Sequence, residues 1–188
     1  MNVFINAISN NGYLALFDTK RNIIAEKHIA IRWNESSQFI ELLDSFIKEN
    51  SLSYTDIENI VCVNGPGSFT GVRTIVLVVN SLGFLHNIKL TDMSYFDLFE
   101  NFPIIKSSSI RDSFVKKDNN SDIEIIQNTD LEIDFEENNI DEIYGESNYI
   151  FENVSIVEKI NYSAIIQDVE FQNKKKIEAL YIKKPNIS

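Results

Sequence analysis

A glycine-rich turn followed by a long apolar run is the feature that most limits what this chain can fold into. Residues 63–73, VNGPGSFTGVR, hold three of the six glycines and one of the three prolines. The residues that follow, TIVLVVNSLGFLH, have no clean polar face. IVLVV favours β structure, but the run from Val72 to His86 is long for a strand and follows a tight turn, so we predict a helix. A helix that is apolar on several sides must be covered on several sides.

The elements around this turn predict an α/β lobe. VFINAI and YLALFD flank SNNG, whose Asn11-Gly12 pair is typical of a hairpin, and NIIAEKHIAI extends the hairpin to a three-stranded meander. NESSQFIELLDSFIKEN has apolar residues at helical spacing, with Asn34 or Ser36 as caps. IENIVCVN and IKLTDM predict buried strands on either side of the turn and its helix. The first 100 residues therefore predict the order β-β-β-α-β-α-β, closed by a helix at SYFDLFEN.

The second half has weaker patterns. PIIKSS, SFVKK, DIEIIQ and DLEIDF predict strands, and NVSIVEKINYSAIIQDV is of mixed character, compatible with a helix. KKKIEALYIKKP predicts a short strand or an extended tail at the end. We divide the chain into an N-terminal lobe, residues 1–101, and a reduced C-terminal lobe, residues 102–188.

The charge is strongly negative and unevenly spread. The formal net charge is −11, and residues 118–146 carry eleven Asp and Glu without a Lys or Arg. An acidic surface repels phosphate backbones, which disfavours tight binding of RNA or DNA by this chain alone. It leaves open a role in an RNA-modifying complex whose RNA contacts come from another subunit. We interpret the acidic segment as a solvated surface, with a docking patch as the alternative.

Several negative features indicate a cytoplasmic protein. The N-terminal residues lack a signal peptide, and no apolar run approaches the roughly 20 residues that span a bilayer, so we expect no membrane contact. The lone Cys62 cannot form an internal disulfide. His28 and His86 stand singly, and neither HExxH nor paired cysteines occur. We therefore expect no catalytic residue, no metal and no cofactor.

The glycine turn fits neither common nucleotide motif. A Walker A loop needs a Lys that is missing here, and the dinucleotide fingerprint needs a glycine where Thr70 stands. Backbone N–H groups at the helix start could still hold an anion, so a structural turn and an anion site both stay open. The candidate residues are Gly65, Pro66, Gly67, Ser68, Phe69, Thr70, Gly71 and Arg73.

The stretch GPGSFTGVR resembles, without a gap, the signature of the TsaB (YeaZ-type) family. EALYIKKP is similar to the closing segment of that family, with Tyr181 in place and Lys183 for an Arg. The resemblance covers the first 100 residues and, loosely, the last ten. It implies an actin/Hsp70/sugar-kinase-like (ribonuclease H-like) lobe followed by a smaller, divergent one.

In function, the resemblance implies a non-catalytic subunit required for threonylcarbamoyladenosine (t6A) modification of tRNA. Such a subunit docks and supports the catalytic TsaD ligase subunit, with a TsaE-type ATPase as a further partner. The chain would meet tRNA only indirectly, through the complex.

Departures from the family pattern point away from catalysis. The Asp-Thr pair that the family carries after its first strand reads Asn6-Ala7, which removes a carboxylate that would hold Mg²⁺ or a metal-bound water. A family His aligns with Glu35, and SSIRDSF is a remnant of an element of the second lobe. Two alternatives stay open: a small actin-like or sugar-kinase-like ATP-binding phosphotransferase, and a homodimeric scaffold of degenerate function.

The predicted partner interface follows from the apolar second helix. In the family this helix packs on the matching helix of a partner, beside the first helix. We expect the following residues to be shared between core and interface: Val72, Ile75, Val76, Val79, Leu82, Phe39, Leu43 and Phe46. Val76→Glu should then abolish partner binding and leave the fold intact. The sequence does not distinguish a homodimer from a heterodimer.

Overall fold

The computed structural model describes residues 1–29 and 38–182. The chain divides into two compact units. Of the described residues, unit 1 comprises 1–29, 38–95 and 162–180, and unit 2 comprises 96–161 and 181–182. Division of the sequence at residue 101 did not anticipate that 162–180 belong with the first unit. The predicted caps Asn34 and Ser36, together with Glu35 and Lys183, lie outside the described residues.

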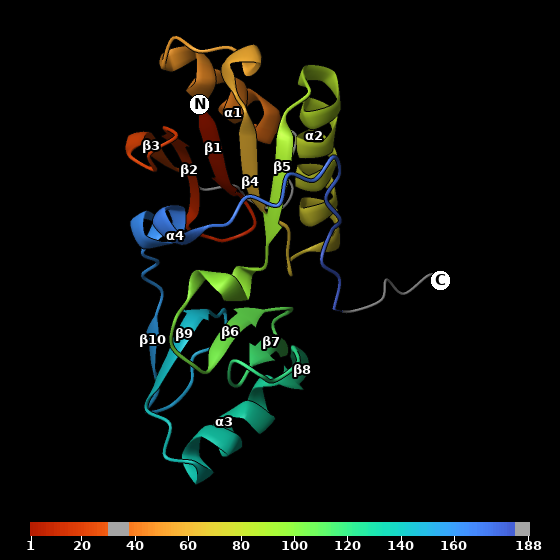
Figure 1. Ribbon diagram of the computed structural model, residues 1–188. Coiled ribbons are helices and arrows are strands. Elements are labelled where there is room, and N and C mark those ends of the chain that lie inside the picture. Colours follow the sequence, from red (N-terminus) through yellow and green to blue (C-terminus); the bar gives the residue numbers. More distant parts are fainter. Residues whose placement is uncertain (30–37, 183–188) are drawn as a thin grey trace, which may run out of the picture. The chain divides into compact units, whose positions relative to one another are not determined.

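Unit 1 is built on a five-stranded mixed sheet in the order β3-β2-β1-β4-β5 (Figure 1). Its first three strands form the predicted antiparallel meander, and β4 and β5 pair in parallel beside β1. The bounds are β1 Asn2–Asn6, β2 Gly12–Phe17, β3 Ile23–Ile29, β4 Asn59–Val63 and β5 Lys89–Met93. All five residues of β4 are buried, as a central strand covered on both faces requires.

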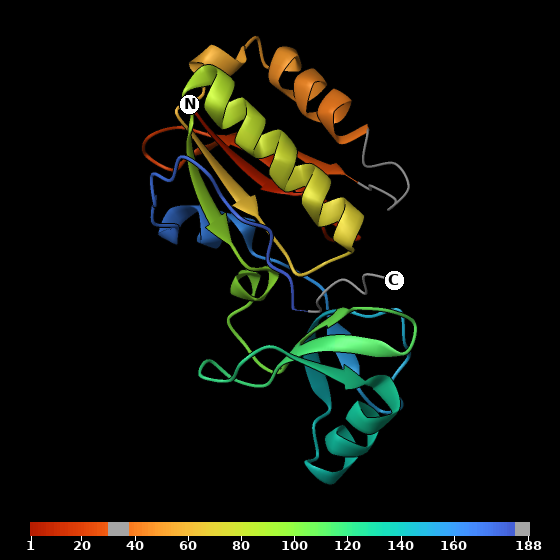
Figure 2. The same cartoon turned by 90° about the vertical axis from the view of Figure 1, so that its right-hand side faces the viewer.

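Two long helices cover this sheet. α1 (Gln38–Glu49) joins β3 to β4 and α2 (Phe69–His86) joins β4 to β5, so the predicted order β-β-β-α-β-α-β is confirmed. The two helices lie next to each other in both ribbon views (Figure 2). Short 3₁₀ helices stand at Tyr54–Asp56 and Tyr95–Leu98, the latter where a closing helix was expected.

Residues 162–180 complete unit 1. α4 (Tyr162–Asp168) brings Tyr162 against the rings of Phe4 and Tyr13. The extended residues after it reach the outer edge of the sheet, where Leu90 and Lys174 exchange backbone hydrogen bonds of 2.9 and 2.8 Å. The edge of β5 is therefore paired over this short stretch by the chain's own C-terminal part.

The described residues of unit 2 repeat the strand order of unit 1 but have no helix that corresponds to α2. Its sheet has the order β10-β9-β6-β7-β8, with β6, β7 and β8 antiparallel and β9 and β10 parallel to β6. The bounds are β6 Ile104–Ser107, β7 Asp112–Lys116, β8 Glu124–Gln127, α3 Asn128–Glu137, β9 Glu142–Glu146 and β10 Ser155–Val157. Residues 147–154 connect β9 to β10 without a helix, at the place in the order where unit 1 has α2.

In the second half, one expected strand is a helix, and one strand was not predicted. DLEIDF is the middle of helix α3, not a strand. Leu131 and Phe135, four residues apart, point into the core, whereas Ile133 between them is 55% exposed. The alternation of apolar and acidic letters resembled a strand, but the burial follows the helical period. Strand β9, EIYGE, was not predicted, because the Glu residues at its two ends obscure the apolar pattern of a strand in the sequence. In the structure, Ile143 and Gly145 of this strand are buried.

A buried ion pair lies in the sheet of unit 2. Lys106 on β6 and Glu146 on β9 are opposite each other in the parallel register, and their side chains form a salt bridge. Lys106 is 1% exposed and Glu146 is 7% exposed. Burial lowers the pKa of the Lys106 ammonium, and the Glu146 carboxylate acts in the opposite direction. The pair therefore balances two charges that neither residue could bury alone.

Candidate functional site

The glycine turn begins where β4 ends, and its first glycine is required by its surroundings. Gly65 has a φ of +138°, and a Cβ there would lie 2.5 Å from the carbonyl oxygen of Leu180. The Gly65 carbonyl accepts a 2.7 Å hydrogen bond from the N–H of Tyr95. Close contact on both sides explains why no larger residue fits at this point.

Ser68 starts helix α2. Its backbone is extended, and its hydroxyl accepts a 3.1 Å hydrogen bond from the N–H of Gly71. Ser68 is therefore the N-cap of α2, and its hydroxyl satisfies one of the N–H groups that have no partner within the helix. Phe69, Thr70 and Arg73 are exposed around this first turn, with the Arg73 guanidinium 5.9 Å from the Phe69 ring centre. An anion site at Ser68 to Gly71 stays a prediction.

The C-terminal segment holds the turn and the helix in place. The N–H of Leu180 donates to the Asn64 carbonyl at 2.9 Å, and the Asn64 amide donates to the Glu178 carbonyl at 2.9 Å. Farther along α2, Asn80 exchanges two side-chain hydrogen bonds with the backbone of Ile177, at 3.0 and 2.9 Å. These two asparagines were not among the predicted site residues. Their signal was a polar residue inside an apolar run, since a buried amide needs partners.

The end of β1, where the family carries its Asp, is closed by the chain itself. Asn6 is fully buried, and its side-chain amide donates a hydrogen bond to the Tyr162 hydroxyl at 2.8 Å. Its side-chain oxygen Oδ1 accepts a hydrogen bond from the Ser9 hydroxyl at 3.1 Å. The Tyr162 ring stacks on Tyr13, with ring centres 3.9 Å apart. Burial is the main cause that raises the pKa of Tyr13, and a hydrogen bond to Glu26 adds to it. Asn6 is thus committed to structural hydrogen bonds.

Most of the residues predicted at the interface lie in the core of unit 1. Val72, Ile75 and Val79 are at most 2% exposed, Val76 is 7% exposed and Leu82 is partly buried. Phe39, Leu43 and Phe46 of α1 are also buried. Val76→Glu would therefore place a charge in the core and disturb the fold. Whether any of these residues also contacts a partner stays a prediction.

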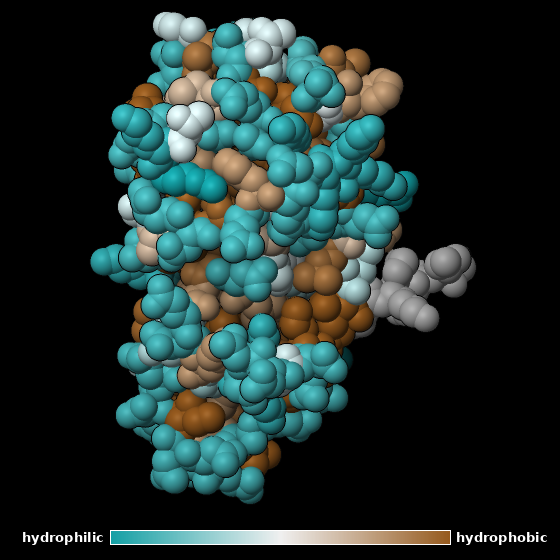
Figure 3. Space-filling view, in the orientation of Figure 1, coloured by the Kyte–Doolittle hydropathy of each residue, from teal (hydrophilic) through white to brown (hydrophobic). Residues whose placement is uncertain are grey.

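Apart from Phe69 in the first turn, the exposed large apolar residues of α2 lie on another side of the helix. Leu77, Phe84 and Leu85 are 64%, 85% and 70% exposed, and their spacing of seven and eight residues places them on one face. We call these three residues the outer face of α2. Hydrophobic colour is visible at the upper end of α2 in Figure 3. α2 is long and apolar enough to cross a membrane, but a core helix of a soluble protein passes the same test.

Within residues 1–29 and 38–182, no group of three or more His, Cys, Asp or Glu side chains is placed to hold a metal ion. Cys62 is fully buried in β4, and burial raises the pKa of its thiol to about 12. Such a thiol stays protonated at neutral pH and is a core residue rather than a nucleophile.

Comparison with known proteins gives one family match and similar solved structures. Residues 29–98 match the family model described as TsaD: tRNA N6-adenosine threonylcarbamoyltransferase. No protein of curated function matches the sequence. The structure of YeaZ from Pseudomonas aeruginosa superposes with a TM-score of 0.50 and 13% identity, over 66% of this chain and 63% of that one. An uncharacterized Pseudomonas aeruginosa protein, with similarity to peptidase YEAZ, gives 0.48 and 13% over 66% and 62%.

The chain therefore spans less than two thirds of the YeaZ chain that it matches. The match to the TsaD family lies in unit 1 up to β5, with its last three residues in unit 2, and includes the glycine turn and α2. The fold is the α/β fold of YeaZ, as the sequence predicted. At 13% identity, the likeness to YeaZ shows a shared fold.

Proposed function

We propose that this chain is a non-catalytic subunit in the t6A modification of tRNA, and that it docks a TsaD-type catalytic subunit through the outer face of α2. The observation that carries the proposal is the exposure of Leu77, Phe84 and Leu85 on a helix whose other sides are packed. Large apolar side chains gathered on one face are typical of a protein–protein contact. A TsaE-type ATPase would join the complex, tRNA contacts would come from other subunits, and the complex would work in the cytoplasm.

The closed end of β1 supports a role without ATP chemistry. A phosphotransferase of this fold would need a carboxylate at the end of β1, where Asn6 instead binds Tyr162 and Ser9. The net charge of −11 also disfavours direct contact with tRNA. Both points favour a subunit that acts through its partner.

The test is co-purification of the chain with a TsaD-type subunit. We expect Leu77→Glu combined with Phe84→Glu to abolish the complex, because two charges would be buried at the contact. Ile150→Glu is the matched control, since Ile150 is 90% exposed in unit 2 and should retain the complex. Circular dichroism must show that all variants are folded.

A homodimer through the same face is the second outcome to distinguish. Sedimentation of the chain alone shows whether it self-associates, and the same double variant shows by which face. In cells depleted of the chain, nucleoside mass spectrometry of tRNA should show loss of t6A. An unchanged amount of t6A would contradict the proposed role. A complex that still forms with the double variant would contradict the proposed face.

A further inference from the structure

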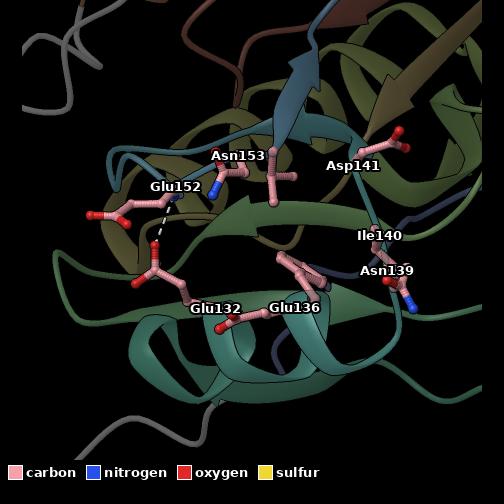
Figure 4. A pocket seen from close by; sticks show the side chains of 9 residues that line it. Glu132, Glu136, Asn139, Ile140, Asp141, Glu152 and Asn153 are labelled. Carbon is pink, nitrogen blue, oxygen red and sulfur yellow. Dashed lines mark hydrogen bonds between the residues drawn. The ribbon is translucent and has the colours of Figure 1, made fainter.

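Unit 2 contains a cavity of about 420 Å³ beside the C-terminal half of α3 (Figure 4). Its apolar lining comes from Phe135 on α3, Ile140 in the connection to β9, and Val154 just before β10. Phe135 is buried and belongs to the core of unit 2, whereas Ile140 and Val154 are partly buried. The cavity therefore gives access to the edge of a hydrophobic core.

Carboxylates surround this apolar lining. Glu132 and Glu136 stand on α3, and Glu152 stands on the opposite connection, as Figure 4 shows. Asp141 is the fourth acidic residue of the lining, and the described lining includes no Lys, Arg or His. The Glu132 carboxylate accepts hydrogen bonds from the Glu152 N–H at 2.8 Å and the Tyr149 hydroxyl at 2.7 Å, which lower its pKa. The opening is thus negatively charged at neutral pH.

The cavity lies next to the connection that lacks a helix. In unit 1 the corresponding connection carries α2, which packs against the sheet beside α1. In unit 2 only residues 147–154 join β9 to β10, and 152–154 line the cavity. One side of α3 consequently has no neighbouring helix among the described residues of unit 2.

We propose that this cavity docks a basic amphipathic helix of a partner protein. Apolar side chains of that helix would pack on Phe135, Ile140 and Val154, and its Lys or Arg groups would meet the four carboxylates. Charge complementarity favours this occupant. The acidic residues around the apolar lining attract a basic ligand, and the apolar lining binds the apolar face of the same ligand. The carboxylates are not grouped to hold a metal ion in the described residues. The inference is independent of the function proposed for unit 1.

The test uses the full chain and a fluorescein-labelled synthetic helix with Leu on one face and Lys beside it. Fluorescence anisotropy at about 0.15 M salt keeps long-range attraction screened. We expect binding that weakens about tenfold for Glu136→Gln combined with Glu152→Gln. Asp122→Asn combined with Glu124→Gln removes the same charge from exposed positions outside the cavity and should change affinity less than about twofold.

Further measurements separate docking from general attraction. Amide shifts in NMR should move at Ile140 and Val154 on addition of the peptide. A peptide with Lys replaced by Glu should not bind, and one with Leu replaced by Ser should bind much more weakly. Absence of binding, equal weakening by both pairs of variants, or displacement by spermidine at the same concentration as the peptide would overturn the proposal.

Discussion

At the scale of single residues, the glycine turn is set by contacts that are far away in sequence. Gly65 has a positive φ and touches the backbone of Leu180, 115 positions later. The sequence shows that this turn is rich in glycine but not which glycine is indispensable. Gly65 is in contact with a backbone atom of Leu180. Every residue has the same backbone atoms, so the sequence carries no signal for this contact.

Gly65→Ala should lower the free energy of unfolding by about 2 kcal/mol or more, because it adds both an unfavourable φ and a clash with the Leu180 carbonyl. Chemical denaturation measures the change. Thr70→Ala is the control within the same motif, since Thr70 is exposed. Equal stability of the two variants would contradict the packing of the C-terminal segment on the turn.

The buried pair of unit 2 gives a second prediction. Lys106→Met leaves Glu146 buried without its cation, so we expect a loss of about 3–5 kcal/mol in unfolding free energy. Adding Glu146→Leu should recover a large part of that loss, since no unpaired charge then remains. Thermal denaturation of the two single variants and the double variant gives the coupling between them. Additive losses would mean that the two side chains do not interact.

At the scale of elements, short-range patterns predicted unit 1 well. Strands β2 and β4 are largely continuous apolar runs, β3 alternates between exposed and less exposed residues, and the first helix has a helical period. α3 was taken for a strand because four acidic residues alternate with its apolar ones. The outer face of α2 could not be separated from its core face by sequence, because apolar residues occupy both faces. Only the position of the sheet distinguishes Val79 from Leu77.

The hydrogen bonds between Asn80 and Ile177 predict how the C-terminal segment is held. Asn80→Ala removes both, leaving the Ile177 backbone without these partners. Trypsin should then cut at Lys174 to Lys176 severalfold faster than in the unmodified chain. Ser81→Ala on the same helix is the control, because its hydroxyl bonds only to the Leu77 carbonyl. Unchanged cleavage would mean that Asn80 does not secure the segment.

At the scale of the whole molecule, the chain leaves unit 1 after residue 95 and returns to it at residue 162. Tyr162, Ile166 and Ile177 are buried, so the returning segment supplies part of the core of unit 1. The sequence could not reveal this return, because α4 is only seven residues long and the residues after it have no strong period. Division by composition alone therefore separated pieces that fold together.

A fragment of residues 1–101 should consequently unfold without a cooperative transition. Addition of a peptide of residues 162–180 should restore a cooperative transition. The peptide supplies the buried side chains of Tyr162, Ile166 and Ile177. It also supplies the hydrogen-bond partners of Asn6, Asn64 and Asn80. Thermal denaturation followed by circular dichroism measures both. A fragment 1–101 that melts as sharply as the full chain would show that the returning segment is dispensable.

The return of the chain also has a consequence for synthesis on the ribosome. Residues 96–161 are translated before 162–180, so the strands and the helix of unit 2 can form while unit 1 still lacks its last segment. A polypeptide that stops before residue 177 would leave Asn64 and Asn80 uncovered, without their backbone partners at Glu178 and Ile177. Proteases and chaperones could recognise such a product by that unfinished surface, and only full-length chains would offer a finished unit 1 for assembly.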